Sequence, residues 1–163
     1  CYIDKNVVIG KNNHLMNSVT VLSGSRIGDG NTIFPGAVIG AIPQDLKFKG
    51  EETTAEIGNN NTIRENVTIN RGTAAKQKTV VGSNNLLMEG MHIAHDVVVG
   101  NGCIIGNTTK IAGEVVIDDF AVISACVLIH RLPLALPTWQ IARGMFERNT
   151  RNHCYVARDR IYS

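Results

Sequence analysis

The stretch VGSNNLLMEGMHIAHDVVVGNGCIIG, residues 81–106, places a branched aliphatic residue at every sixth position. The same spacing runs through residues 3–39, 57–69 and 81–129 without a missed step. An amphipathic helix spaces apolar residues by three and four, and a sheet of hairpins turns every ~8–12 residues. Neither pattern sustains a period of six, so the repeat excludes both structures.

Each six-residue unit consists of a short extended piece and a bend, with its branched side chain pointing inward. Asn or Asp occupies many bend positions, and glycine follows the aliphatic residue at Gly10, Gly28, Gly40, Gly58, Gly82, Gly100 and Gly106. We expect these residue types to relax the backbone at the bends. Three such sides close one turn of about 18 residues, and successive turns stack at the strand spacing of about 4.8 Å. The repeat therefore predicts an all-β fold, a parallel β-helix.

Two segments interrupt the repeat without shifting its phase: AIPQDLKFKGEETTAE, residues 41–56, and RGTAAKQKT, residues 71–79. The first is predicted to form a loop that projects from the coil at about residues 40–56. Loops on rigid scaffolds often carry binding groups, although a plain surface excursion suits the composition equally well. We expect residues 1–130 to form the β-helix and residues 131–163 to form a separate tail.

The composition indicates a soluble cytoplasmic protein with one core. The chain has 163 residues, which suits one domain. No apolar run approaches the ~20 residues of a membrane-spanning helix, and the N-terminus lacks an export-signal pattern. The four scattered cysteines lack CxxC spacing, which favours a reducing compartment. Because the first residue is Cys1 rather than Met, we expect the chain to begin inside a longer protein.

The tail, residues 131–163, carries six Arg and no Lys against two acidic residues, and it lacks the six-residue period. A basic segment can contact nucleic acid, but a solvated segment is the more common case, so we expect no nucleic-acid partner. An open β-helix end exposes unpaired strand groups. The tail is therefore predicted to be irregular and to cap the coil.

Histidines and their predicted neighbours gather on one strip of the coil surface. Adding one turn to His95, in MHIAHD (residues 91–96), gives Gly113, and adding two turns gives Arg131 beside His130. These positions should line about 10 Å of surface. His92 and His95 flank an inward aliphatic position without occupying it, so both side chains should be reachable from outside.

The residue types on this strip suit acyl transfer. An imidazole is a natural general base near neutral pH, and a carboxylate can fix its tautomer. Asp96 can do this for His95 if a corner of the coil turns the two adjacent side chains together. Gly113 would expose a backbone N–H that can stabilise an oxyanion. Two alternatives are that the histidines only decorate the surface, or that His92, His95 and His130 bind zinc.

The zinc alternative is the weaker one, and we expect no metal. His130 lies two turns, about 10 Å, from His95, and no cysteine joins the cluster.

Four stretches closely resemble the UDP-N-acetylglucosamine acyltransferases that begin lipid A synthesis, in the form found in Bacteroides-like bacteria. They are IPQDLKFKGE (42–51), IGNNNTIRENVTINRGT (57–73), NNLLMEGMHIAHDVVVGNGCIIGN (84–107) and IAGEVVIDDFAVIS (111–124). The resemblance covers residues 1–130. It implies a left-handed parallel β-helix and a homotrimer with active sites between subunits. It also implies transfer of an (R)-3-hydroxyacyl group from acyl carrier protein to the 3-hydroxyl of UDP-N-acetylglucosamine, without a cofactor.

The resemblance also implies roles for individual residues. His95 matches the general base, Asp96 its orienting partner, and Gly113 the oxyanion-stabilising residue. Substrate-binding positions match Asp45, Lys47, His92 and His130, with Gln44 beside the first two.

This sequence departs from the family at two further cleft positions and in its tail. Glu114 stands where many members have histidine, and Arg131 stands where glutamine is common; both are predicted to contact substrate. The family continues with a helical C-terminal domain that is not recognisable here, and with opening coils before the position of Cys1. An inactive trimeric scaffold is therefore one alternative. Another hexapeptide-repeat enzyme, an N-acyltransferase of the same pathway or a zinc carbonic anhydrase, is the other.

Overall fold

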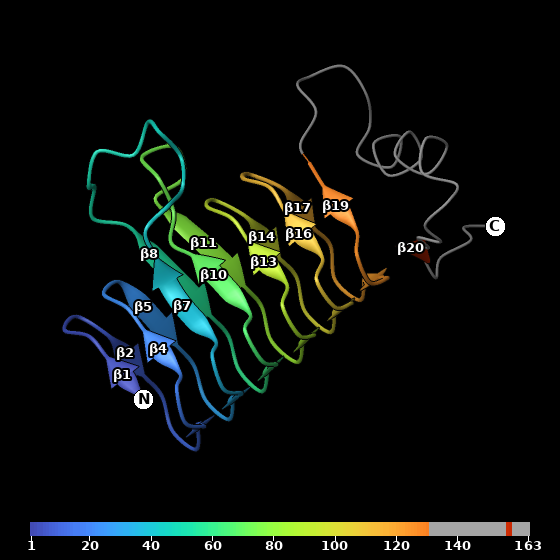
Figure 1. Ribbon diagram of the computed structural model, residues 1–163, viewed down its shortest axis with the longest axis horizontal. Helices are drawn as coiled ribbons and strands as arrows, with labels where there is room; N and C mark the ends of the chain where they lie inside the picture. Colours follow the sequence, from blue (N-terminus) through green and yellow to red (C-terminus); the bar gives the residue numbers. More distant parts are fainter. Residues whose placement is uncertain (131–155, 158–163) are drawn as a thin grey trace.

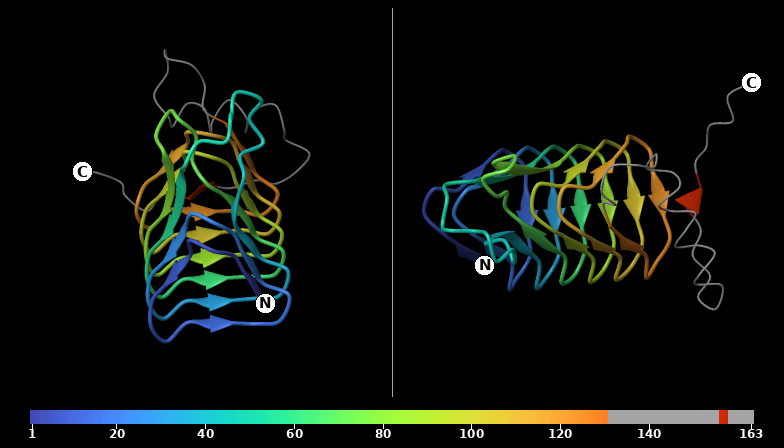
Figure 2. Two further views of the ribbon diagram at one scale, coloured as in Figure 1. Left: turned by 90° about the vertical axis from the view of Figure 1, so that its left-hand side faces the viewer. Right: turned by 90° about the horizontal axis from the view of Figure 1, so that it is seen from above.

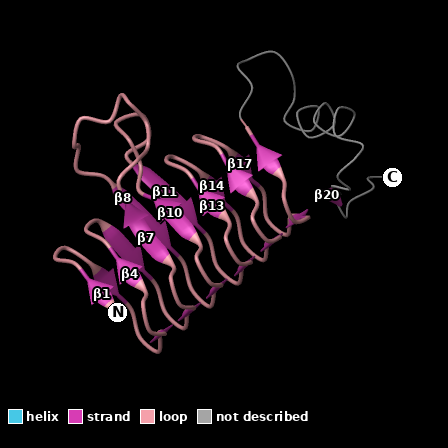
Figure 3. Cartoon of the chain, viewed as in Figure 1, coloured by secondary structure: helices cyan, strands magenta, loops and turns pink. Residues whose placement is uncertain are grey.

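The computed structural model describes residues 1–130 and 156–157, and these residues form strands and turns without a helix (Figures 1 and 3). The chain winds as a left-handed parallel β-helix with three flat sides, which is clearest when the coil is viewed along its length (Figure 2). The all-β prediction and the predicted coil are confirmed. No helix in the described part of the chain is long and apolar enough to cross a membrane.

Each side of the coil is one sheet whose strands come from every third step of the chain. Sheet A contains β1 (Tyr2–Ile3), β4 (Thr20–Val21), β7 (Val38–Ala41), β10 (Thr68–Asn70), β13 (His92–Ile93), β16 (Lys110–Ile111) and β19 (Leu128–Ile129). Sheet B contains β2 (Val8–Ile9), β5 (Ser25–Ile27), β8 (Thr54–Ile57), β11 (Lys78–Val81), β14 (Val98–Val99) and β17 (Val116–Ile117). Sheet C contains β3 (His14–Leu15), β6 (Thr32–Ile33), β9 (Thr62–Ile63), β12 (Leu86–Leu87), β15 (Ile104–Ile105), β18 (Val122–Ile123) and β20 (Val156–Ala157).

β20 pairs antiparallel with β18, whereas the coil strands pair parallel. The rest of the predicted tail over residues 131–163 lies outside the described residues.

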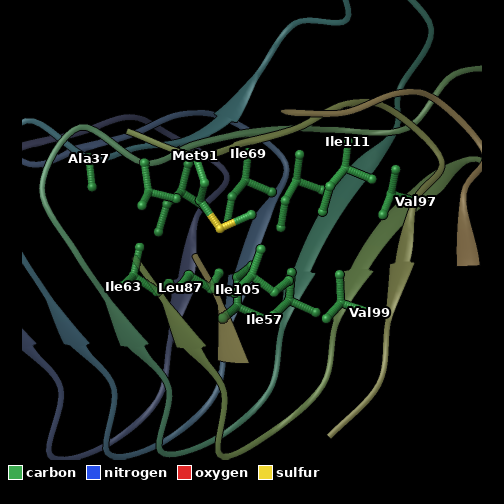
Figure 4. Packing of buried hydrophobic residues seen from close by; sticks show 14 of the residues in the cluster. Ala37, Ile57, Ile63, Ile69, Leu87, Met91, Val97, Val99, Ile105 and Ile111 are labelled. Carbon is green, nitrogen blue, oxygen red and sulfur yellow. The ribbon is translucent and has the colours of Figure 1, made fainter. Parts of the chain in front are cut away.

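The repeated aliphatic residues form the core, one column for each sheet. Ile69, Ile93 and Ile111 stack inside sheet A, each with no exposed surface, and Figure 4 shows the equivalent columns of the other sheets beside it. Burying such a side chain contributes about 1.5–3 kcal/mol. Ile3, in the first layer that the structure describes, is 51% exposed.

The stacking offset is 18 residues only where no segment interrupts the repeat, as between Ser83 and Asn101. It grows to 30 across the first interruption, between Asn31 and Asn61, and to 24 across the second, between Asn61 and Asn85. The first excursion occupies residues 42–53, inside the predicted range of about 40–56, and the second occupies residues 71–77. Figure 1 shows both rising beside each other from the same edge of the coil.

Corners of the coil require a left-handed backbone once every six residues, and Asn or Gly usually fills that position. The glycine that follows the aliphatic residue has a different reason. A Cβ on Gly58 would lie 2.7 Å from the carbonyl oxygen of Gly82, and one on Gly82 would lie 2.5 Å from that of Gly100. Our expectation that these glycines relax the bend was therefore wrong for this pair, because close stacking of layers is what excludes a side chain there.

Buried asparagines tie the layers together at the corner between sheets B and C. Asn61 is 1% exposed, and its side-chain amide donates to Asn31 Oδ1 at 3.0 Å and to the carbonyl of Gly82 at 2.9 Å. Its Oδ1 accepts from the backbone N–H of Asn85 at 2.9 Å. Asn85 continues the ladder to the N–H of Cys103 at 2.7 Å. This corner carries none of the predicted site residues.

Asn61→Ala is expected to lower the free energy of unfolding by about 3 kcal/mol, because it leaves the N–H of Asn85 and the carbonyl of Gly82 buried without partners. Urea or thermal unfolding of the purified chain measures the change. Asn107→Ala is the matched control, because Asn107 is exposed at a corner of the coil. Equal unfolding midpoints for the two variants would contradict the role of the ladder.

Candidate active site

The candidate site lies on the corner where sheet A passes into sheet B, in consecutive layers of the coil. Both excursions leave the coil at this corner, between β7 and β8 and between β10 and β11. The next two layers contribute the corner after β13, which contains His95, and the corner after β16, which contains Gly113. One edge of the prism thus carries the irregular segments and the histidine that the sequence singled out.

His95 and Asp96 face each other across the corner after β13. His95 Nδ1 lies 2.8 Å from Asp96 Oδ2, although adjacent side chains on a strand would point apart. The left-handed backbone of Asp96, with φ of 60°, turns the carboxylate back toward the ring. Asp96 has no exposed surface, and the His95 side chain is 19% exposed, so the ring is reachable while its partner is not.

The carboxylate of Asp96 has further partners from the second excursion. Thr73 donates its hydroxyl to Asp96 Oδ2 at 2.5 Å and its backbone N–H to Oδ1 at 3.0 Å. Burial raises the pKa of Asp96, but hydrogen bonds from the Thr73 hydroxyl, the His95 ring and the Thr73 N–H outweigh it, so the pKa lies below its usual value. An ionised Asp96 accepts the Nδ1 proton of His95 and leaves Nε2 as the basic nitrogen.

Gly113 lies directly against the His95 ring, one layer further along the coil. A Cβ on Gly113 would fall 2.5 Å from Cε1 and 2.7 Å from Nε2 of His95. The backbone N–H of Glu114 donates to the His95 carbonyl at 3.0 Å and fixes the two layers in register. Within residues 1–130 the N–H of Gly113 has no hydrogen-bond acceptor. The predicted stacking of these positions is confirmed.

The first excursion brings Asp45 to the other ring nitrogen, where Asp45 Oδ2 lies 3.9 Å from His95 Nε2. Asp45 Oδ1 accepts the backbone N–H of Lys47 at 2.9 Å, which forms a tight local turn. The two residues line a pocket of about 190 Å³. Thr73 and Glu114 contribute to its other walls, so both excursions and the layer of Gly113 meet there.

Contacts from the end of β10 and the start of the second excursion hold the first excursion and the end of β7 in place. The backbone N–H of Arg71 donates to the carbonyl of Ala41 at 2.9 Å. The side-chain amide of Asn70 donates to the backbone carbonyl of Ile42 at 3.1 Å. The Arg71 guanidinium lies 5.5 Å from the centre of the Phe48 ring. Such a cation–π contact favours one arrangement of the loop.

Other predicted site residues lie apart from this pocket. His92 is on the outer face of β13, with Nδ1 2.7 Å from the hydroxyl of Thr68, and no described hydrogen bond or ion pair links it to His95. Burial, with a smaller contribution from Lys110, lowers the pKa of His92. Gln44 is exposed on the first excursion, and His130 is exposed after β19. Arg131 lies outside the described residues.

Among residues 1–130 and 156–157, no three His, Cys, Asp or Glu side chains converge as a metal site. A larger depression of about 470 Å³ lies on the outer face of sheet B, around Arg26 and Glu56. It contains none of the predicted site residues. The smaller pocket at the corner is lined by Asp45 and Thr73, which lie against His95 and Asp96, and together with this pair it forms the candidate active site.

Sequence reasoning missed the threonines that hold Asp96. Thr73 lies in the second excursion, and Thr79 Oγ1 accepts the backbone N–H of Asp96 at 2.8 Å. Thr79 lies one 18-residue turn before Val97, so counting back from the residue after Asp96 leads to it. Thr73 offered no such signal, because an excursion has no fixed register with the coil.

Comparison with known proteins supports the same picture. The model of the bacterial transferase hexapeptide family, with six repeats, matches residues 6–41 and 78–113. The chain is 48% identical over 122 residues to the acyl-[acyl-carrier-protein]–UDP-N-acetylglucosamine O-acyltransferase of Thermodesulfovibrio yellowstonii, which covers 74% of this chain and 47% of that protein.

Two solved structures show the same coil. The UDP-N-acetylglucosamine acyltransferase of Bacteroides fragilis 9343 is 74% identical with a TM-score of 0.80, covering 80% of this chain and 51% of that one. The Acinetobacter baumannii protein is 36% identical with a TM-score of 0.68, covering 79% and 64%. The chain thus spans about half the length of the first two of these relatives. By its repeat and these similarities, the chain belongs to the hexapeptide-repeat transferases, in the family of the UDP-N-acetylglucosamine O-acyltransferases.

Proposed function

We propose that this chain transfers an (R)-3-hydroxyacyl group from acyl carrier protein to the 3-hydroxyl of UDP-N-acetylglucosamine, the first step of lipid A synthesis. One observation carries the proposal: a histidine whose Nδ1 is held by a buried carboxylate lies with its ring against a glycine whose N–H has no hydrogen-bond acceptor among residues 1–130. This arrangement supplies a base and an oxyanion donor at one point, as acyl transfer requires.

In the proposed reaction, His95 Nε2 takes the proton of the sugar 3-hydroxyl while that oxygen attacks the thioester carbonyl. Asp96 holds the Nδ1–H and stabilises the positive ring that forms. The N–H of Gly113 donates to the oxyanion of the tetrahedral intermediate. The intermediate then collapses with breakage of the carbon–sulfur bond, and the leaving thiolate of acyl carrier protein takes the proton from Nε2. No cofactor or metal takes part.

The substrates would be held by residues around the corner pocket. Asp45 lies 3.9 Å from Nε2, beside the place where the reacting hydroxyl would bind, and Lys47 would offer a cation for the nucleotide phosphates. Glu114 borders the pocket. The more distant predicted residues, Gln44, His92, His130 and Arg131, would contact substrate only in the assembled enzyme.

We further propose that the protein works as a homotrimer in the cytoplasm. Large apolar side chains are exposed on several strands and on the first excursion: Ile42, Leu46, Ile104, Val116 and Val122. Exposed apolar side chains of this kind favour a subunit interface. The described cysteines, Cys1, Cys103 and Cys126, are free thiols, which suits a reducing compartment.

A direct assay tests the proposed activity. Purified chain, hydroxyacyl carrier protein and UDP-N-acetylglucosamine should give the O-acylated nucleotide sugar, detected by mass spectrometry, together with free carrier-protein thiol. An amine-bearing sugar acceptor and added zinc serve as comparison arms. A trimer without transfer would indicate a scaffold, transfer only to the amine would indicate an N-acyltransferase, and zinc-dependent CO₂ hydration would indicate a carbonic anhydrase. Each of these outcomes contradicts the proposed function.

A further inference from the structure

We propose that Thr73 is a positioning residue that orients the general base His95 through Asp96. The second excursion places Thr73 beside this carboxylate. The inference rests on the proposed function for the role of His95. The arrangement itself follows from contacts within the described residues.

Thr73 holds both oxygens of the Asp96 carboxylate. Its hydroxyl bonds Oδ2, the oxygen that also faces His95 Nδ1, and its backbone N–H bonds Oδ1. A carboxylate bonded at both oxygens cannot turn about its terminal torsion without losing a bond. Thr73 is 6% exposed and Asp96 is fully buried, so water cannot replace a lost partner at low cost.

The hydroxyl proton of Thr73 is committed to Asp96. Thr73 Oγ1 accepts the backbone N–H of Ala75 at 3.2 Å, so the hydroxyl is an acceptor toward the excursion and a donor toward the carboxylate. The Thr73 carbonyl accepts the N–H of Gln77 at 2.7 Å, which closes the excursion into a turn. The second excursion thus forms a turn that holds the Thr73 side chain.

The hydrogen bonds from Thr73 to Asp96 determine where the basic nitrogen of His95 lies. With the carboxylate plane fixed, the Nδ1–H has one acceptor in one direction, and the ring is held with Nε2 beside Gly113 and Asp45. Thr79 holds the Asp96 backbone from the other side, because its Oγ1 accepts the N–H of Asp96. Without the Thr73 hydroxyl, the carboxylate keeps its hydrogen bond to the Thr73 N–H but can rotate. The His95 ring then samples orientations in which Nε2 points away from the sugar hydroxyl.

Three substitutions separate a positioning role from a structural one. Thr73→Val and Thr73→Ala remove the hydroxyl, and Thr73→Ser restores it. We expect folded Val or Ala variants to lose about 10–100-fold in kcat, with KM for UDP-N-acetylglucosamine changed less than about twofold. The Ser variant should recover to within about threefold. In an Asp96→Asn background the loss from Thr73→Val should disappear, because the two residues act through one contact.

An activity-independent measurement accompanies the kinetics. In ¹⁵N-histidine-labelled protein, the ring nitrogens of His95 should report a proton fixed on Nδ1 in the wild type and a mixed tautomer in Thr73→Val. An inactive wild type that still shows this change would contradict the proposed function and support the positioning role. Unchanged kcat and unchanged ring signals in Thr73→Val, or a Ser variant as defective as the Val variant, would overturn the inference.

Discussion

His95→Ala is expected to lower kcat of hydroxyacyl transfer by about 10²–10⁴-fold, the contribution of a positioned general base. His95 is the histidine whose Nδ1 a buried carboxylate holds, and its Nε2 lies 3.9 Å from Asp45, which lines the corner pocket. Removing the ring leaves the sugar hydroxyl without a base, while binding contacts elsewhere remain. KM for the nucleotide sugar should therefore change little.

The matched control is His14→Ala, because His14 is an exposed histidine on sheet C, away from the corner pocket. It should keep wild-type kcat. Both variants should elute at the wild-type oligomer size, since neither side chain belongs to the core. A His95→Ala enzyme within about threefold of wild-type kcat would rule out this histidine as the base.

Gly113→Ala should reduce kcat by about 10²-fold or more, and it should also destabilise the protein. The added Cβ would lie 2.5 Å from His95 Cε1, closer than real Cβ contacts allow. The ring cannot simply swing aside, because Asp96 holds Nδ1 and Thr73 holds Asp96. Either the ring gives up that hydrogen bond or the two layers move apart, and overpacking of this kind costs about 1–3 kcal/mol.

A double substitution tests the cause of that loss. If the clash with the ring is what destabilises Gly113→Ala, then the same change made together with His95→Ala should cost little further stability, because the space is then empty. Thermal unfolding of the two single variants and the double variant measures this. Full additivity of the two shifts in unfolding midpoint would show that the clash with the ring is not the source of strain. A Gly113→Ala enzyme with wild-type kcat would contradict the predicted loss of activity.

The period of six was sufficient to predict the coil, its core and one contact of the candidate site. Every predicted inward aliphatic lies in a strand, because the repeat and the fold share one geometric unit. Counting one turn from His95 led to Gly113, since no interruption separates the two layers. The roles of these residues rest on chemistry that a repeat does not encode.

Contacts that involve the excursions could not be predicted in the same way. Asp45 and Thr73 reach His95 and Asp96 from segments that break the register, so no fixed offset relates them. The turn that brings Asp96 to His95 depends on a left-handed corner, a position that Asn or Gly usually fills and that an aspartate only sometimes adopts. The family resemblance pointed to Asp45 where spacing did not, and it left Thr73 unnoticed.

The uniform stacking of the coil limits how finely it can place chemical groups. Along the axis, side chains on successive layers differ by whole multiples of one strand separation, about 4.8 Å, which is coarse beside the tenths of an ångström that proton transfer demands. The two excursions escape this increment, because their length is not tied to the layers. The excursions can therefore place side chains around the imidazole at heights between those of successive layers, which the coil itself cannot do.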